Sequence, residues 1–373
     1  METLNPFISS GYYSPDYFCD REKETKVMIE ALKNGRNMTL ISPRRMGKTG
    51  LIKHVFYHLE HEKPTVATFY LDIFFTQNLN EFVQLFAGMV LGKLDLTAQR
   101  TFKKVGRFIK NLRPVLTIDD YTGLPKLSVQ IDPNREEGSL KDIFDYLQAS
   151  GKECYIAIDE FQQVTAYPEK GVEALLRSYI QFLPNVHFIF SGSKHHVMEE
   201  MFFSAKRPFY QSTQILSLDK IDRAEYYRFA SKFFGPKRPL SPDTFLYIYD
   251  EFDGHTWYIQ LILNRLYGNR QKPDIPAVQR VITDIVAESE YPFGKLLAAY
   301  APVAVRLLKA IANERCVKEI NAGKFISRYG LKATSSVNTA LKKLIDKELV
   351  YRTKDGYIVY DRFMAIWLRQ QPY

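Results

Sequence analysis

Residues 42–49, Ser-Pro-Arg-Arg-Met-Gly-Lys-Thr, are the stretch of this sequence that decides its fold. The apolar run Met38–Ile41 precedes them, and the apolar spacing of residues 51–59 predicts a helix directly after them. A strand, a tight loop and a helix N-terminus in this order are the context of a P-loop, which holds phosphate through backbone N–H groups, the helix dipole and one lysine. The Walker A pattern G-x-x-x-x-G-K-[ST] is matched except at its first position, where Ser42 stands.

Each residue type in this octet has a role in phosphate binding. Gly47 lets the backbone approach the phosphates, Lys48 reaches the β- and γ-phosphates, and Thr49 ligates magnesium. We therefore expect ATP or ADP and Mg²⁺ as ligands. Two interpretations remain for the arginines of the loop, which either contact phosphate or face solvent or a second domain. The predicted nucleotide-binding residues here are Ser42, Pro43, Arg44, Arg45, Met46, Gly47, Lys48, Thr49 and Gly50.

The composition is that of an ordinary globular protein, with 46% hydrophobic and 25% charged residues in 373, enough for two or three domains. No apolar run is long enough to span a bilayer, and the first residues lack a signal-peptide layout, so no membrane association is expected. The three cysteines form neither a metal-ligand spacing nor a disulfide framework, which favours a cytoplasmic location. A net charge of +9 favours polyanionic partners without identifying one.

Apolar runs that alternate with helical patterns predict an α/β domain with a mostly parallel sheet. After the first strand, further strands are expected at residues 66–73, 154–158, 187–190 and 213–218. Ligands of such sheets bind at the carboxyl ends of the strands. The phosphate loop, the pair Asp159-Glu160 and the triplet Ser191-Gly192-Ser193 are all predicted to lie at that edge.

Two further features lie between the second and third expected strands. Residues 100–113 contain six Lys or Arg and no acid, and they predict an amphipathic helix. Its basic face is interpreted either as solvated surface or as a patch for nucleic acid or an acidic partner. Residues 114–132 predict a β-hairpin that projects from the core domain.

The two acids at the end of the strand 154–158 indicate ATP hydrolysis if the P-loop is real. Asp159 is predicted to hold magnesium together with Thr49, and Glu160 to polarise the attacking water. Ser193, with Ser191, is predicted to hydrogen-bond that water or the γ-phosphate. The alternatives are acids that cap the next segment and an ordinary polar strand end. The candidate catalytic residues are Lys48, Glu160, Ser193 and Arg207.

Two residues outside these motifs carry alternative interpretations. Arg207 is predicted to neutralise γ-phosphate charge, in its own chain or in a neighbouring subunit, and a plain salt bridge is the alternative. His255 opens a predicted helix, where its ring would lie over the nucleotide. The alternative for His255 is a helix cap or a surface residue.

The pattern changes twice along the chain and predicts three domains. Residues 1–220 form the P-loop core, and residues 221–300 give helices alone and form a helical lid. In residues 301–373, three helices precede two short β runs joined by Asp355-Gly356, a strong hairpin signal. This arrangement predicts a winged helix, whose third helix begins near residues 334–336 with good N-cap residues. The expected lid helices are 224–234, 242–253, 256–267 and 275–288.

An ordered set of motifs extends over most of the chain. The motifs are Phe18, Arg21 and Glu22; Pro-Arg-Arg-Met-Gly-Lys-Thr at 43–49; Asp-Glu-Phe at 159–161; Phe-Ser-Gly-Ser at 190–193; Arg-Pro-Phe-Tyr at 207–210; and Gly-His-Thr-Trp-Tyr at 254–258. This order resembles the archaeal-type ATPases of the STAND class, which are related to AAA+ ATPases and to archaeal origin-recognition proteins.

The resemblance implies an ASCE-type parallel sheet in the order 5-1-4-3-2, an ATP site between sheet and lid, and a slow ATPase that acts as an ATP/ADP-governed switch. It also implies that the segment of Phe18 and Arg21 lies near the base of the nucleotide and that His255 belongs to the lid side of the site. These three residues complete the predicted nucleotide-binding set. The family often has glycine at the position of Ser42 and proline at the position of Thr256. These two differences bear on loop geometry and on the rate of hydrolysis.

Two functions of different classes follow. The first is an ATP-binding, slowly hydrolysing switch, in which nucleotide closes the lid and repositions the winged helix. The alternative is a nucleotide-binding, DNA-binding regulator with little or no hydrolysis. In that case residues 334–347 would enter the major groove, with Lys342 and Lys343 near phosphates. A protein partner of the winged helix and an ATP-dependent homo-oligomer are further hypotheses.

Overall fold

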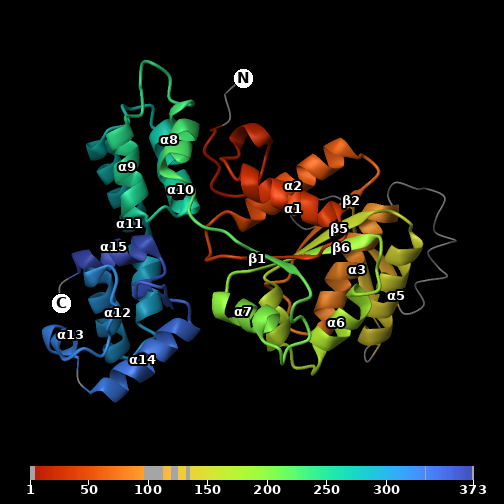
Figure 1. Ribbon diagram of the computed structural model, residues 1–373. Helices are drawn as coiled ribbons and strands as arrows, with labels where there is room; N and C mark the ends of the chain where they lie inside the picture. The colour runs from red at the N-terminus through yellow and green to blue at the C-terminus, as the bar shows by residue number, and fades with distance from the viewer. Residues whose placement is uncertain (1–4, 96–111, 119–124, 132–134, 332, 372–373) are drawn as a thin grey trace. The chain divides into compact units, whose positions relative to one another are not determined.

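The computed structural model describes residues 5–95, 112–118, 125–131, 135–331 and 333–371 of the chain (Figure 1). The chain divides into two compact units. The core unit is Ser10–Tyr226, and the helical unit joins the described residues of Met1–Ser9 to those of Tyr227–Tyr373. Across the described ranges, no helix has both the length and the apolar character needed to cross a membrane.

A five-stranded parallel sheet forms the centre of the core unit. Its strands are β1 (Met38–Ile41), β2 (Ala67–Asp72), β5 (Cys154–Asp159), β6 (Val186–Gly192) and β7 (Gln214–Ser217). They lie in the order β2-β5-β6-β1-β7. Numbered among themselves and read from β7, they give 5-1-4-3-2, so the predicted order is confirmed.

Helices cover both faces of this sheet (Figure 1). They are α1 (Glu22–Lys33), α2 (Lys48–Glu62), α3 (Leu79–Asp95), α5 (Glu136–Ala149), α6 (Val172–Ile180) and α7 (His195–Phe203), with the short 3₁₀ helices η1 (Pro15–Tyr17) and η2 (Phe161–Ala166). In β5, Ile156 and Ile158 belong to the core shared with α3, α5, α6 and α7, whereas Tyr155 and Ala157 belong to the core shared with α1 and α2. A strand buried on both faces has no polar alternation, which explains its continuous apolar sequence.

Strands β3 (Leu112–Ile118) and β4 (Pro125–Ile131) pair antiparallel as a second, two-stranded sheet. Val129 and Ile131 are buried in the same core as α3. Most of the predicted basic helix, residues 100–111, lies outside the described residues. The prediction is wrong for Leu112 and Arg113, which begin β3 because they pair with Ile131 and Gln130. Strand pairing here overrides local helical spacing.

The helical unit begins within α8 (Arg223–Ser231) and continues with α9 (Pro242–Glu251), α10 (Thr256–Gly268) and α11 (Ile275–Leu297). The last of these runs beyond the predicted end at 288 and contains Pro292. Phe293, just after the proline, packs on Trp367 with ring centroids 5.7 Å apart, and Leu297 is buried. Tertiary packing therefore holds the helix together past a residue that weakens it.

A winged helix follows, built from α12 (Pro302–Glu314), α13 (Gly323–Arg328), α14 (Thr334–Asp346), β8 (Val350–Arg352) and β9 (Tyr357–Val359), and α15 (Arg362–Gln370) ends the chain. At the β8–β9 turn, a Cβ on Gly356 would lie 2.6 Å from the carbonyl oxygen of Val317, so only glycine fits. Helix α14 starts where predicted, but its N-cap is Ala333. The prediction of a Ser or Thr cap is wrong because Thr334 is already helical.

Charged contacts join α15 to the helices of the predicted lid within this unit. Arg369 pairs with Glu251 at 2.9 Å, and Arg362 pairs with Asp253 at 3.1 Å. The backbone N–H of Arg362 also donates to the Tyr258 hydroxyl at 3.0 Å. The lid helices and the winged helix therefore pack as one compact unit.

Candidate functional site

The predicted phosphate-binding loop joins β1 to α2. Arg45 and Gly47 have positive φ values of 70° and 91°. A Cβ on Gly47 would meet nothing within 4 Å, so glycine serves there for its backbone conformation and not for space. Ser42 is fully buried and is not among the residues with positive φ. The first position of this loop therefore does not require the conformational freedom of glycine.

Lys48 lies inside this loop at the start of α2. Its side chain is buried, and Nζ donates to the carbonyl oxygens of Ser42 at 2.9 Å and Pro43 at 3.2 Å. Met46 is buried as well and keeps the loop anchored in the core unit. An ammonium held beside a helix N-terminus concentrates positive charge, which is the arrangement that binds phosphate.

Asp159 ends β5 next to Thr49 of α2. Oγ1 of Thr49 donates to Oδ2 of Asp159 at 3.1 Å, and the hydroxyl of Tyr70 on β2 donates to the same oxygen. The Tyr70 hydroxyl also lies 3.3 Å from Oγ1 of Thr49. Burial, followed by the charge of Asp159, raises the pKa of Tyr70 well above its usual range, so its hydroxyl stays a proton donor.

Thr49 and Asp159 offer the hard oxygen donors that magnesium prefers. Asp72 pairs with Asp159 in the strand register, and its pKa is raised by burial and by the charges of Asp159 and Glu160. A divalent cation would neutralise this concentration of carboxylates. The described part of the chain has no group of three or more His, Cys, Asp or Glu that could hold a metal alone. Magnesium at nucleotide sites usually takes only one or two protein ligands, and phosphate oxygens and water complete its coordination.

Glu160 follows Asp159 in a left-handed conformation, with φ of 57°. Its carboxylate accepts a hydrogen bond from Oγ of Ser193 at 2.8 Å and another from the side-chain amide of Gln162. Nε of Arg44 in turn donates to Oγ of Ser193 at 3.2 Å. A chain of hydrogen bonds thus connects the phosphate-binding loop, the end of β6 and the second acid of β5.

Phe18 contacts the first two turns of α2. Its ring stacks on His54 with centroids 4.2 Å apart, and a Cβ on Gly50 would lie 3.3 Å from the ring. Gly50 therefore gives the aromatic ring room beside the phosphate-binding helix. Contact between Phe18 and the base of a nucleotide stays a prediction.

Arg21 is buried and connects three segments. Its guanidinium donates to Glu24 at 2.8 Å, to the carbonyl oxygen of Asp219 at 2.6 Å and to that of Met46 at 3.5 Å. Met46 belongs to the phosphate-binding loop, and Asp219 follows β7. The structure therefore places Arg21 behind the loop, where it supports the backbone.

Arg207 follows α7 and forms ion pairs with two acids of neighbouring helices. Its guanidinium lies 3.2 Å from Glu173 and 3.5 Å from Glu200. Helix α7 starts two residues after Ser193 and has nine residues, which carries the chain about 13 Å away from that serine. The salt-bridge interpretation is confirmed, and a role toward the phosphate of a neighbouring subunit stays a prediction.

His255 belongs to the helical unit, where it is the N-cap of α10. Its side chain is 6% exposed, so it is not a surface residue. Nε2 lies 3.5 Å from the hydroxyl of Tyr351 in β8, which connects the start of α10 to the winged helix. Contact between His255 and a nucleotide stays a prediction.

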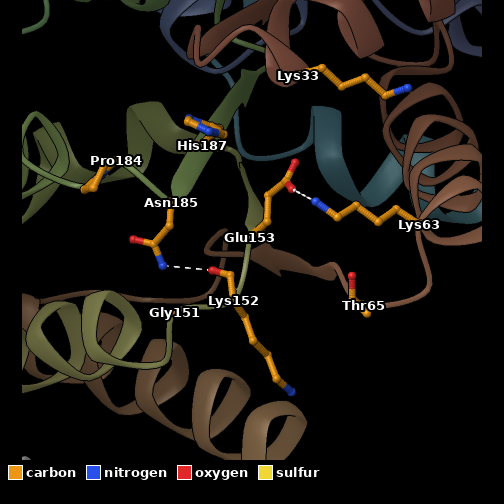
Figure 2. Close-up of a pocket in the computed structure, with 9 residues that line it drawn as sticks. All are labelled: Lys33, Lys63, Thr65, Gly151, Lys152, Glu153, Pro184, Asn185 and His187. Carbon is orange, nitrogen blue, oxygen red and sulfur yellow. Dashed lines mark hydrogen bonds and ion pairs between the residues drawn. The ribbon is translucent and has the colours of Figure 1, made fainter.

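A separate cavity of about 490 Å³ lies near the beginning of β5 and β6 (Figure 2). Its lining includes Lys63 and Glu153, which form an ion pair of 2.6 Å, and Lys152, whose carbonyl oxygen accepts a hydrogen bond from Asn185. Because these strands are parallel, their first residues lie at the sheet edge opposite the phosphate-binding loop. This cavity is therefore not part of the predicted nucleotide site.

Sequence reasoning missed Tyr70, Asp72 and Gln162. Tyr70 and Asp72 share one face of β2, whereas Phe69 and Leu71 lie in the core on the other face. The alternation of polar and apolar residues at the end of this strand was the available signal. Gln162 is 5% exposed and follows the acids by two residues. No sequence signal showed that its side chain turns back to Glu160.

Comparisons with known proteins agree with this architecture. A model of a probable winged helix domain matches residues 291–370. The Walker-type ATPase PABY2304 of Pyrococcus abyssi is 17% identical, with 98% of this chain and 99% of that chain covered and a TM-score of 0.67. The ORC2 protein of Aeropyrum pernix, in ADPNP–ADP complexes, is 17% identical over 98% and 96% of the two chains, with a TM-score of 0.61.

The ORC1 protein of Aeropyrum pernix, in complex with DNA, is 15% identical over 95% of this chain and 93% of that chain, with a TM-score of 0.53. At these identities the likeness concerns the fold. None of the curated proteins compared with the chain matches it. A family model described as an ATPase domain predominantly from Archaea matches residues 18–262 of 373. Since this match covers more than half of the sequence, the chain belongs to that family of predominantly archaeal ATPase domains.

Proposed function

We propose that the chain binds ATP with magnesium in the loop 42–49 and hydrolyses it slowly, as an ATP/ADP-governed switch of the STAND class. The observation that carries the proposal is the meeting of three parts at one sheet edge. These are the loop with Lys48, the Thr49–Asp159 pair and the Ser193–Glu160 pair. Membership of an ATPase-domain family supports the same conclusion.

Each of these residues has a distinct role in the proposed reaction. Lys48 and the first N–H groups of α2 hold the β- and γ-phosphates. Thr49 and Asp159 would hold magnesium, which supplies charge neutralisation to the phosphates when it is bound. Glu160 orients a water toward the γ-phosphate, and Ser193 fixes the carboxylate of Glu160.

Slow hydrolysis follows from the contacts of Glu160. Its Oε2 already accepts hydrogen bonds from Ser193 and Gln162. Both donors hold this carboxylate in a fixed position, and we infer that one of these bonds has to break if Oε2 is to accept a water proton. Arg44, which donates to Ser193, is the loop residue placed to respond to a bound phosphate.

The switch role concerns the helical unit. Its lid helices and winged helix are joined by the pairs of Glu251 with Arg369 and Asp253 with Arg362. We infer that a nucleotide which closes the lid moves the winged helix with it. Arg207 is the candidate for contact with the phosphate of a neighbouring copy in an ATP-dependent oligomer.

The first experiment measures ATP affinity and turnover for the wild-type protein, Lys48→Ala and Glu160→Gln. Lys48→Ala should lose at least tenfold in affinity for ATP–Mg, because it removes a charged partner of the phosphates. Glu160→Gln should bind ATP normally and lose at least 100-fold in turnover. Equal ATP–Mg affinity of Lys48→Ala and the wild-type protein would show that the site is misplaced.

One observation favours the alternative of a DNA-binding regulator with little or no hydrolysis. The exposed face of α14 carries Asn338, Lys342 and Lys343, a polar and basic surface on the third helix of a winged helix. The ORC1 protein, whose fold is similar, was solved in complex with DNA. A duplex titration at two salt concentrations separates the two functions.

A further inference from the structure

Tyr70 is a partly buried phenol beside the candidate nucleotide site of the core unit. It lies on β2, and its ring packs against the core that β1 and β5 share with α1 and α2. Nζ of Lys53 on α2 lies 5.2 Å from the centre of the ring. The ring is therefore fixed from two sides, and its hydroxyl points to the start of α2 and the end of β5.

The hydroxyl of Tyr70 completes the set of donors around Asp159. Oδ1 of Asp159 accepts a hydrogen bond from the backbone N–H of Glu160 at 3.0 Å. Oδ2 accepts one hydrogen bond from Oγ1 of Thr49 at 3.1 Å and another from the hydroxyl of Tyr70. Asp159 is 5% exposed, so protein groups rather than bulk water set the direction of its carboxylate. Hydrogen bonds to a charged acceptor are the stronger kind.

Tyr70 also contacts the other predicted magnesium ligand. Its hydroxyl lies 3.3 Å from Oγ1 of Thr49, so one side chain from β2 touches both ligands, which come from α2 and β5. Outer groups that orient metal ligands affect metal affinity strongly, although they do not touch the metal.

We propose that Tyr70 is a positioning residue that holds Thr49 and Asp159 in register for magnesium and thereby sets the magnesium requirement of nucleotide binding. This inference rests on the proposed function, because it assigns a role at the same site. The phenol does not bind nucleotide itself. It orders the two ligands before the cation binds. Less binding free energy is then lost when the ligands rearrange around the cation.

Tyr70→Phe tests this role, because it removes the hydroxyl and keeps the ring beside Lys53. The measurement is the affinity for a fluorescent ADP analogue, first in EDTA and then across a magnesium titration. In EDTA the affinity should stay within about twofold of wild type. The magnesium concentration that gives half of the full affinity gain should rise about tenfold, as expected for one lost hydrogen bond to a charged group.

Tyr155→Phe is the matched control. Its hydroxyl also donates to a carboxylate, that of Glu153, and its ring lies in the same core. It stands at the other end of β5, so its loss should leave the magnesium titration unchanged. In a Thr49→Ala background, Tyr70→Phe should add little, because residues that act as a unit are not additive.

Three outcomes would overturn the inference. One is a magnesium titration of Tyr70→Phe equal to that of Tyr155→Phe. Another is an equal loss of nucleotide affinity with and without magnesium, which would make Tyr70 a nucleotide contact or a structural residue. The third is full additivity with Thr49→Ala. A wild-type protein that binds no nucleotide would instead reject the proposed function, so the two failures are distinguishable.

Discussion

Arg21 is a buried cation whose charge is satisfied by one carboxylate and two carbonyl oxygens. Glu24 lies one turn along α1, Met46 lies in the phosphate-binding loop, and Asp219 follows β7. A buried guanidinium is stable only when its N–H groups are paired, so these segments must keep their places relative to one another. The rigidity of the loop backbone therefore begins at a residue that is far from it in sequence.

Arg21→Ala should weaken both the fold and nucleotide binding. It leaves the carbonyl oxygens of Met46 and Asp219 without their donor, the first of them buried, and we expect the free energy of unfolding to fall by about 2–3 kcal/mol. We also expect ATP affinity to fall about tenfold, because the loop loses its support behind Met46. Urea denaturation and an ATP titration measure the two effects.

Arg36→Ala is the control for this substitution. Arg36 follows α1 and pairs with Glu30 at 3.0 Å in a solvent-exposed position. Removing it should change stability by less than about 1 kcal/mol. If Arg21→Ala and Arg36→Ala behaved alike, Arg21 would have no supporting role.

Helix α2 carries two groups of side chains along its length. Its first turn carries Lys48 and Thr49, and its second turn carries His54, which stacks on Phe18 and contacts the hydroxyl of Tyr12 at 2.9 Å. Nε2 of His58, one turn further, lies 3.2 Å from Nε2 of His54. The helix that begins at the phosphate site is therefore held from outside by an aromatic and imidazole cluster.

This cluster predicts a loss of stability in mild acid. Burial, and then the charge of His58, lowers the pKa of His54 to about 4 from 6.5. In the unfolded chain His54 becomes protonated near pH 6.5, whereas in the native chain it becomes protonated only near pH 4. The free energy of unfolding should thus be fully retained above pH 6.5 and fall as pH drops toward 4.

Urea midpoints of His54→Gln and wild type between pH 7 and pH 4.5 measure this contribution. Solvent screening of a half-buried ring reduces it to about 1 kcal/mol. Between these pH values the free energy of unfolding should change by that amount less in His54→Gln than in wild type. His61 is an exposed histidine of the same helix, and His61→Gln should keep the wild-type pH dependence. Parallel curves for wild type and His54→Gln would refute the assignment.

At the scale of the whole molecule, the lid helices and the winged helix belong to one compact unit. Glu251 at the end of α9 pairs with Arg369 of α15 and with Arg315 after α12, at 2.9 and 3.3 Å. The side chains of Glu251 and Arg369 are largely shielded, so their pair is less screened than a surface pair, whereas Arg315 is mostly exposed. We therefore expect a ligand of the winged helix to be coupled to the lid helices.

A DNA-binding winged helix predicts a salt-dependent affinity for duplex that depends on α14. Lys342→Glu should weaken binding at low salt about tenfold and reduce the slope of log K against log salt by about 1. Lys237→Glu makes the same charge change in an exposed loop of the same unit and should have a smaller effect. No binding of the wild-type protein at low salt would remove the DNA-binding alternative.

The sequence alone predicted the sheet and brought the candidate site residues to one edge of it, because apolar runs, turn residues and strand-end acids are local signals. The strand order came from the family resemblance. Local signals did not predict the contacts of Tyr70 or Arg21, since these depend on strand register and on backbone carbonyls of distant segments. The same cause explains why Leu112 lies in a strand and why α11 continues past Pro292.

Ser42 has a consequence for finding other loops of this kind. A text search that demands glycine at the first motif position would pass over this chain, although its backbone there has no positive φ. The left-handed conformations fall at Arg45 and Gly47. A search for unrecognised relatives should therefore leave the first letter open and ask instead which positions tolerate a left-handed turn.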